Sequence, residues 1–413
     1  MTVRRSDEIR VVGLISGTSL DGIDVAAAGL SVEDGTVLLR PLGHLELPYP
    51  DELRADLLAA LPPNPCTAER LTKLDTQVGQ AFAEAAAHGV RELAGGDADL
   101  IASLGQTVFH WVENGVARGT LQVGQPAWIA ERTGLPVVAD LRSRDVAAGG
   151  HGAPLASTLD ALWLRNLADE SGHAVAGLNI GGIANITVVP PEGEVVAYDT
   201  GPGNALLDVA AARVTGGTQR SDLDGRLAAL GTVRPELLAR LLADAYYAAQ
   251  PPKSTGKEVF HGGYLDSATT GLTLSGEDLL ATLTELTAVS IARECVRHDV
   301  VTVVVSGGGA DNPSLMAALA RNLPDTALKT SDDLGLPRAG KEAYLTALLG
   351  WLTLSGVSGN VPTATGARGP RVLGSISPGD GPLRLPAPLG GTVTRLRVAG
   401  EADKTVGDTH EPS

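Results

Sequence analysis

Small and polar residues are concentrated in a turn near the start of the chain. The turn separates two mostly apolar segments, residues 9–15 and 23–30. Glycines let backbone N–H groups approach a ligand without a Cβ atom in the way, hydroxyls add donors, and a carboxylate can hold magnesium through water. The strand–turn–strand pattern therefore predicts a cradle for a nucleotide's terminal phosphates, with an ordinary polar hairpin as the alternative. The candidate residues are Gly17, Thr18, Ser19, Leu20, Asp21, Gly22 and Asp24, with Asp21 as the water-mediated metal contact.

Two further glycine-rich turns lie in the second half of the chain. Residues 174–190 repeat the strand–turn–strand pattern in physical type, though not in letters, and another turn follows the apolar run within 301–309. Such turns permit close approach of phosphate, ribose or adenine, and helix N-terminal N–H groups attract anions. Two cradles, one per half, suggest a nucleotide held from both sides, although each alone is also a common α/β turn. The candidates are Gly181, Gly182, Gly307, Gly308, Gly309 and Asn312.

Four charged residues stand where a reaction would need a base or a binding group. Asp199 precedes a Gly-Pro-Gly turn that opens a helix, so it is either a general base or a helix cap. Arg142, within DLRSRD, can bind a carboxylate through two hydrogen bonds or belong to a surface salt-bridge cluster. Lys253 can neutralise phosphate, without a Walker A glycine pattern, or be solvated. Glu342 can bind a ligand or simply suit the helix dipole.

The composition is that of a globular, acidic protein. The chain has 413 residues, 43% of them hydrophobic, and a formal net charge of −16. The length suggests two domains, and the charge argues against nucleic acid or an anionic membrane as the main partner. Cys66 and Cys295 suit a reducing compartment, and neither a membrane span nor a signal peptide is evident, so we expect a cytoplasmic protein.

Strands alternate with helices in both halves, which predicts an α/β fold whose sheets are covered by helices. Segment 67–94 carries apolar residues three or four positions apart, so one face of a helix there should be buried. The predicted strands are 9–15, 23–31, 36–46, 99–103, 135–139, both arms of 174–190, and 301–309. The predicted helices are 51–61, 67–94, 126–133, 156–168, 203–214, 222–230, 234–248, 276–298, 313–322 and 340–354.

These elements suggest two lobes followed by a tail. We expect a first, phosphate-binding lobe over 1–138, joined by a segment near 362–378. A second lobe over 139–361 would carry the candidate base, the contacts to a second ligand and the nucleoside contacts. Residues 379–413 are rich in Pro, Gly and polar residues, which predicts a flexible tail.

Several strings, taken together and in order, resemble the anhydro-N-acetylmuramic acid kinases of bacterial cell-wall recycling. The resemblance covers roughly residues 10–378 and rests on many motifs rather than on one. It implies the two-domain fold of actin, hexokinase and Hsp70-like ATPases, a duplicated RNase H-like fold with an interdomain cleft. The strings are GLISGTSLDGID (13–24), DLRSRDVAAGGHGAPL (140–155), LNIGGIANIT (178–187), DTGPGNALLD (199–208), PPKSTGKEVF (251–260), VSGGGADNPSLM (305–316), KEAYLTALLGW (341–351) and NVPTATGAR (360–368).

The resemblance also implies a double reaction with ATP and magnesium as cofactors. Enzymes of this family use water to open the anhydro bridge of 1,6-anhydro-N-acetylmuramic acid at C1 and transfer the γ-phosphoryl group of ATP to O6. The product is N-acetylmuramic acid 6-phosphate. It assigns the base to Asp199 and sugar contacts to Arg142 and Glu342, and it retains Gln106 and Thr107 near the sugar. The family also commonly forms homodimers.

Two positions depart from the pattern of the family. Leu104 stands where a His is usual and His151 where a Gln is usual, whereas Gln125 stands where an acidic or amide residue is common. Leu104 removes one hydrogen-bonding side chain, whereas His151 can replace an amide with a group whose protonation varies near neutral pH. These changes bear on fine sugar contacts and leave Asp199 and the glycine turns untouched.

Two other functions fit parts of the pattern. A kinase for another hexose or amino sugar would use the same fold, with the Asp deprotonating a sugar hydroxyl in place of water. A chaperone-like ATPase would couple nucleotide state to a protein partner, but the chain lacks a separate peptide-binding domain. A substrate panel separates these alternatives.

Overall fold

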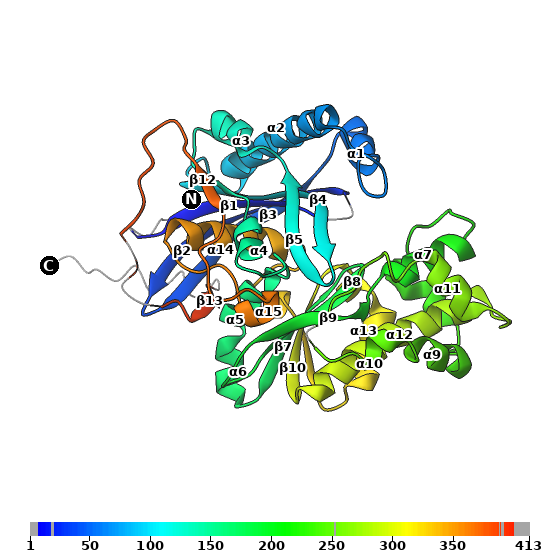
Figure 1. Cartoon of the computed structure of the whole chain (residues 1–413). Helices are drawn as coiled ribbons and strands as arrows, with labels where there is room; N and C mark the ends of the chain where they lie inside the picture. The colour runs from blue at the N-terminus through cyan, green and yellow to red at the C-terminus, as the bar shows by residue number, and fades with distance from the viewer. Residues whose placement is uncertain (1–6, 18–19, 252, 388, 390–391, 400–413) are drawn as a thin grey trace. The chain divides into compact units, whose positions relative to one another are not determined.

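The chain folds into two compact units, and one of them is built from both ends of the sequence. The computed structural model describes residues 7–17, 20–251, 253–387, 389 and 392–399. Unit 1 comprises Met1–Trp163 and Gly335–Ser413, and unit 2 comprises Leu164–Leu334 (Figure 1). Both boundaries differ from the predicted ones at 138 and 361. The later one differs because the helix predicted over 340–354 packs on the sheet of unit 1.

The sheet of unit 1 has the order β12-β6-β4-β1-β2-β3-β13, with β5 paired to β4. Its first three strands form an antiparallel meander, and the first strand then pairs in parallel with the fourth. The predicted strands near 9–15, 23–31 and 36–46 are confirmed. The strands are β1 (Ile9–Ser16), β2 (Gly22–Glu33), β3 (Thr36–Pro48), β4 (Leu100–Glu113), β5 (Val116–Val123), β6 (Val137–Ala139), β12 (Ser375–Ser377) and β13 (Arg395–Val398).

Two long helices cover opposite faces of this sheet. Val12 and Val25 belong to the core that α2 completes, and Phe82 of α2 is fully buried there, so the predicted apolar face is confirmed. Gly13, the residue after Val12 on β1, faces α14, where a Cβ atom would collide with the carbonyl oxygen of Ala343. The helices of unit 1 are α1 (Asp51–Leu58), α2 (Ala68–Glu92), α3 (Pro126–Thr133), α4 (Ser143–Ala147), α5 (Ala156–Trp163), α14 (Lys341–Leu354) and α15 (Pro362–Thr365).

The sheet of unit 2 repeats the strand order of unit 1. Its order is β11-β10-β7-β8-β9, with an antiparallel meander of β7, β8 and β9 and parallel pairing of β7 with β10 and β10 with β11. The order β3-β2-β1-β4-β6 in unit 1 corresponds strand for strand to β9-β8-β7-β10-β11 in unit 2, with β5, β12 and β13 as additions in unit 1, which is the duplicated arrangement predicted above. The strands are β7 (Ala174–Ile180), β8 (Ile183–Val189), β9 (Val196–Pro202), β10 (Val300–Ser306) and β11 (Ala327–Thr330).

Helices α12 and α13 pack on this second sheet and share its apolar core. A further group, including α7 and α9, builds its own core against α12. The helical elements are α6 (Arg165–Ser171), α7 (Ala205–Val214), η1 (Leu223–Gly225), α8 (Arg226–Leu230), α9 (Pro235–Leu242), α10 (Ala245–Ala248), α11 (Gly262–Thr269), α12 (Gly276–Arg297), η2 (Gly308–Asp311), α13 (Pro313–Asn322) and η3 (Asp332–Leu334).

The predicted flexible tail contains an ordered strand. Residues 395–398 pair in parallel with β3 as β13, and Leu396 of this strand is 0% exposed. Its short alternation, one buried leucine between two arginines, is too brief to stand out in a sequence rich in Pro and Gly. The hairpin of β4 and β5 was likewise missed, and the predicted helix over 156–168 is two helices, α5 and α6.

No helix in the described part of the chain is long and apolar enough to cross a membrane.

Replacing Leu396 with Ala should lower the free energy of unfolding by about 2–3 kcal/mol, because it leaves a cavity where β13 meets the core. Leu385 lies in the same predicted tail but is 62% exposed. Leu385→Ala is therefore the matched control and should change stability by less than about 0.5 kcal/mol. Chemical denaturation measures both, and equal effects would contradict the assignment of β13 to the core.

Candidate functional site

Two of the predicted glycine turns lie at one edge of the sheet in unit 2. β7 and β10 run in parallel with Asn179 opposite Ser306, so the turns that follow both strands leave the sheet side by side. Gly181 and Gly182 follow β7, and residues 307–309 follow β10. In open α/β sheets, ligands bind outside the carboxyl ends of parallel strands. The structure thus brings these predicted residues together at an edge suited to a nucleotide.

The glycines after β10 have different local reasons. Gly307 has a φ of +79°, and a Cβ atom there would collide with the side chain of Asn179. A Cβ atom on Gly309 would collide with the side chain of Ile180, so both glycines serve packing against β7. Gly308 has open space around it. Asn312 is the N-cap residue of α13, and its side-chain oxygen accepts a hydrogen bond from the N–H of Leu315 at 3.1 Å.

The turn after β7 carries a cation that the sequence reasoning did not select. A Cβ atom on Gly182 would lie 3.3 Å from Nζ of Lys257, an exposed residue. The carbonyls of Gly181 and Gly182 accept hydrogen bonds from the backbone N–H groups of residues 203–205. This ties the turn to the start of α7 and leaves Lys257 at its surface. Burial raises the pKa of Asp208 to about 6, and the positive charge of Lys257 opposes this shift.

Lys253, the predicted phosphate contact, is buried. Its Nζ lies 2.8 Å from Oε1 of Glu294 on α12, and both side chains are only 4% exposed. The same ammonium group lies 5.0 Å from the centre of the Tyr246 ring. A buried and paired ammonium does not fit a contact with an incoming phosphate, and the exposed Lys257 fits it better. The sequence shows only two lysines four residues apart, with nothing to mark which one is covered.

Asp199 on β9 is held by the segment that follows Pro252. Its Oδ2 accepts hydrogen bonds from the N–H of Thr255 at 2.9 Å and from the hydroxyl of Ser254 at 3.0 Å. Within the described residues no hydrogen bond reaches its other carboxylate oxygen, Oδ1. Burial raises the pKa of Asp199, with the charge of Glu258 adding to it, while the two hydrogen bonds oppose the shift. Asp199 does not cap α7, whose N-cap residue is Asn204.

The first predicted phosphate turn lies at the end of β1. Thr18 and Ser19 fall outside the described residues. Leu20 is fully buried with a φ of +57°, so its part in the turn is to shape the backbone from the core side. Gln106 is also buried, and its Nε2 donates to the carbonyl of Gly17 at 3.2 Å. Gln106 therefore supports this turn through Gly17.

Acidic residues gather beside this turn. Burial, together with the charges of Glu46, Glu342 and Asp21, raises the pKa of Asp24 to about 7. Such mutual repulsion favours a cation nearby. Among the described residues, however, no group of three His, Cys, Asp or Glu side chains could hold a metal by itself. The donor set therefore fits a magnesium ion that keeps its waters and is held mainly by phosphates, with carboxylates as outer contacts.

Arg142 forms part of a second loop in unit 1. Its Nη1 donates to the carbonyl of Gly152 at 2.8 Å, while Nε is buried without a hydrogen-bond partner among the described residues. Burial lowers the pKa of Arg142, and the charge of Glu342 opposes this. Asp145 is fully buried and accepts from the N–H of Gly152 at 2.8 Å, so it fixes the same loop. The arrangement is an anchored guanidinium rather than a surface salt-bridge cluster.

The remaining predicted sugar contacts are spread over unit 1. Glu342 is an exposed residue in the first turn of α14 and influences both Arg142 and Asp24 electrostatically. His151 is exposed, and its backbone N–H donates a hydrogen bond to the carbonyl of Thr365 at 2.8 Å. Thr107 accepts a hydrogen bond from Gln122 at 3.3 Å. His110 of the β4–β5 hairpin was not selected from the sequence. It is an exposed residue whose Nδ1 lies 2.9 Å from the hydroxyl of Thr120.

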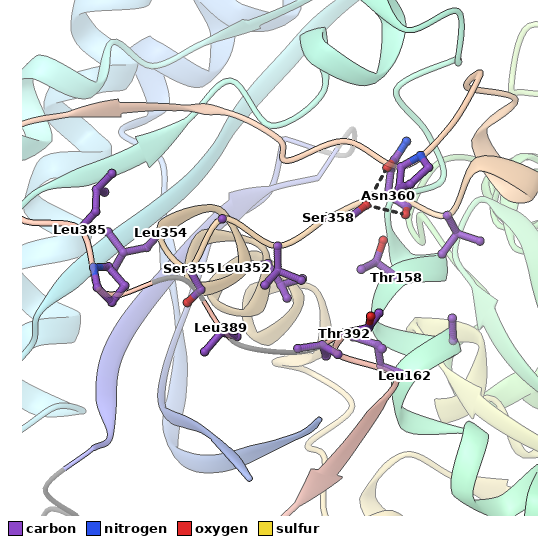
Figure 2. Close-up of a pocket in the computed structure, with 17 residues that line it drawn as sticks. Thr158, Leu162, Leu352, Leu354, Ser355, Ser358, Asn360, Leu385, Leu389 and Thr392 are labelled. Atoms are coloured by element: carbon purple, nitrogen blue, oxygen red, sulfur yellow. Dashed lines mark hydrogen bonds between the residues drawn. The ribbon is translucent and has the colours of Figure 1, made fainter. Parts of the chain in front are cut away.

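Two cavities in unit 1 differ in whether residues considered in the sequence analysis line them. One of about 600 Å³ is lined by residues of α5, the end of α14 and five residues further along, Leu385, Pro386, Leu389, Thr392 and Val393. Ser358 and Asn360, which are hydrogen-bonded to each other, also line it (Figure 2). It contains none of the predicted site residues. A second cavity of about 700 Å³ is lined by Leu104, Gln122 and Gln125. Leu104, one of the two departures from the family pattern, thus shares a cavity wall with Gln125.

The repeated sheet order defines a duplicated, two-unit α/β fold. The family model for anhydro-N-acetylmuramic acid kinase matches residues 9–379, and the chain therefore belongs to that family. A curated relative from Streptomyces coelicolor with that name is 54% identical over 95% of this chain and 100% of its own length. One from Rhodococcus erythropolis is 51% identical over 90% of this chain and 94% of its own.

Solved structures give more distant matches. A ROK hexokinase from Thermus thermophilus is 24% identical, covering 83% of this chain and 98% of its own, with a TM-score of 0.33. An activator of 2-hydroxyisocaproyl-CoA dehydratase from Clostridium difficile with bound ADPNP is 13% identical, covering 83% and 94%, with a TM-score of 0.39.

The raised pKa of Asp24 predicts a pH-dependent effect of Asp24→Asn. A pKa of about 7, against an ordinary 3.8, means that the folded protein binds this proton more tightly than the unfolded chain does. The resulting stabilisation is present at low pH and is lost as pH rises toward 7. The Tm of the variant relative to the wild type should therefore increase between about pH 4 and about pH 8. Thermal melts across this range measure it, with Glu113→Gln at the hairpin end as control. A constant difference would contradict the shift.

Proposed function

We propose that this protein is an ATP-dependent kinase that converts 1,6-anhydro-N-acetylmuramic acid into N-acetylmuramic acid 6-phosphate in peptidoglycan recycling. The observation that carries the proposal is the carboxylate of Asp199, half-buried, held through Oδ2 and with Oδ1 unbonded among the described residues. A raised pKa suits a general base that works near neutral pH. Family membership supplies the substrate.

In this mechanism Oδ1 of Asp199 accepts a proton from water as the water oxygen attacks C1 of the sugar. The C1–O6 bond breaks, and its electron pair leaves on O6. O6 then attacks the γ-phosphorus of ATP, and ADP departs with the bridging oxygen. The proton taken by Asp199 returns to solvent. Atoms balance as anhydro sugar, water and ATP giving the 6-phosphate, ADP and a proton.

The phosphate contacts are assigned to the glycine turns of each unit. Backbone N–H groups at the turn containing Gly17 and Gly22 and at Gly181–Gly182 would bind phosphate oxygens, and Lys257 would supply the positive charge. Asp21 and Asp24 would hold Mg²⁺ through water, and the ion would neutralise phosphate charge when bound. Gly308, with open space above it, is the nucleoside contact that fits best of the three glycines after β10.

The sugar contacts are assigned to unit 1. The substrate carries a carboxylate, and the anchored guanidinium of Arg142 retains an Nε without a partner among the described residues. A guanidinium can bind a carboxylate through two hydrogen bonds, which orients the sugar. Glu342 and His151 would contact other polar groups of the sugar. We further propose that the enzyme works in the cytoplasm, where ATP is available, and forms a homodimer.

The direct test is product formation by the purified protein from the anhydro sugar, ATP and magnesium. Asp199→Asn should lower kcat by about 10²–10⁴-fold, because the amide cannot take the proton from water. Nucleotide affinity, measured by calorimetry, should stay close to that of the wild type. Turnover of glucose or N-acetylglucosamine in place of the anhydro sugar would support the kinase for another sugar. Full activity of the variant would remove Asp199 from the role of base.

Lys257→Met should raise KM for ATP about tenfold or more while the folded state is unchanged, because a charge-assisted contact to phosphate is lost. The residue is exposed, so its removal costs little packing. Steady-state kinetics with varied ATP measure this effect, and Lys329→Met on β11 is a control lysine in the same unit. An unchanged KM would exclude Lys257 from the phosphate site.

A further inference from the structure

The backbone on both sides of Asp199 is tied to one buried carboxylate. Tyr198, the preceding residue on β9, donates its hydroxyl to Oε2 of Glu294 at 3.1 Å. Lys253, whose carbonyl accepts the N–H of Asp199 at 3.1 Å, binds Oε1 of the same carboxylate at 2.8 Å. Glu294 therefore holds the strand that carries Asp199 and the segment that bonds its side chain.

The segment after Lys253 sets the orientation of the Asp199 carboxylate. Ser254 and Thr255 are the two residues that bond Oδ2, and they follow Lys253 directly. A third tie comes from Tyr246, whose hydroxyl donates to the backbone carbonyl of Asp199 at 2.7 Å. The same ring lies beside the Lys253 ammonium. A displacement of Lys253 would therefore move both donors to Oδ2 and would turn Oδ1 away from its present direction.

The ion pair of Lys253 and Glu294 is held in place by further contacts. Burying two charges costs free energy unless additional hydrogen bonds satisfy them. Glu294 meets this condition, because Nε of Arg297 lies 2.9 Å from Oε2, in addition to the contacts of Tyr198 and Lys253. α12, which carries Glu294, belongs to the apolar core of the second sheet. The carboxylate is thus mounted on a helix that cannot shift without disturbing that core.

We propose that Glu294 and Lys253 form a positioning pair for Asp199, which locks residues 253–255 so that Oδ1 stays aimed at the attacking water. The proposal rests on the proposed role of Asp199 as base. It assigns Lys253 to the support of the base and away from the nucleotide. Neither residue is a catalytic residue, since both act through Asp199.

The charged and titratable groups around this device are few. Glu294 faces Lys253, Arg297 and Tyr198, and the Tyr198 hydroxyl is in turn 2.7 Å from Nε2 of His298. The thiol of Cys295, next along α12, is buried beside them. Asp199 itself faces Tyr246 and lies near Glu258. A change in the pH profile of the enzyme can therefore be traced to a short list of groups.

The main test is the double variant Lys253→Met/Glu294→Gln. It removes both fully buried charges together, and Arg297, the remaining partner of Glu294, is 32% exposed and can be solvated, so no uncompensated charge is left in the core to unfold the protein. We expect kcat to fall about 10- to 100-fold, as misplacement of a reacting group does, with KM for ATP unchanged. Loss of the bonds to Oδ2 should also move the acidic limb of the kcat profile to higher pH, because those bonds favour the ionised carboxylate.

Three matched variants isolate the effect. Glu285→Gln changes a carboxylate on the same helix that pairs with Arg321 and bonds Asn322 on α13. It removes the charge of that ion pair far from Asp199 in the sequence, and within the described residues Glu285 makes no contact with Lys253, so the change should leave kcat and the pH profile unchanged. Tyr198→Phe removes one bond to Glu294 without burying a charge and should shift the acidic limb in the same direction by less. In an Asp199→Asn background the double variant should cause no further loss, because the pair acts only through Asp199.

Each outcome decides the matter. A double variant with normal kcat and a normal acidic limb would overturn the positioning role, even if Asp199→Asn is inactive and the proposed function stands. A raised KM for ATP with an unchanged acidic limb would indicate that Lys253 contacts the phosphates of ATP, and would overturn its positioning role. An active Asp199→Asn would refute the base itself, which is a failure of the proposed function. If the double variant does not fold, an unshifted limb in Tyr198→Phe refutes the proposal.

Discussion

In each unit, one strand pairs antiparallel with one neighbour and parallel with the other, and the candidate glycine turns follow that strand. These strands are β1, between β2 and β4, and β7, between β8 and β10. The backbone after such a strand must turn sharply where the neighbouring parallel strand also ends. Backbone N–H groups of a turn that leaves a sheet in this way can bind an anion. The duplicated topology therefore provides one such turn in each unit.

Buried charge is the second constraint, and it explains which polar residues shape the site rather than bind a ligand. Asp145 is fully buried and bonds the N–H of Gly152, the hydroxyl of Thr365 and the amide of Asn360. Glu294 is buried with three donors of its own. A buried carboxylate with a full set of partners cannot accept a proton from a ligand at low cost. Asp199, with one oxygen unbonded among the described residues, differs from both.

Much of the fold follows from local pattern, and the misses have physical causes. The apolar stripe of α2 and the glycine turns after β1 and β7 follow from spacing alone, because burial on one face and tight turns demand those residue types. β13 was missed because its stability comes from pairing with β3, more than 350 residues earlier in the sequence. Local propensity carries no signal for such pairing.

The site shows the same division between local and distant information. A general base after a strand and before a Gly-Pro-Gly turn can be predicted from adjacent letters, but the choice between Lys253 and Lys257 cannot. That choice depends on Glu294, which lies on a helix some forty residues further along and reaches Lys253 only when α12 packs on the sheet. A lysine can be buried when a buried carboxylate forms an ion pair with it, as Glu294 does with Lys253. Lys257 is exposed to solvent. The chemical role of each lysine is therefore a property of the packed core, although the motif that contains both is short and continuous.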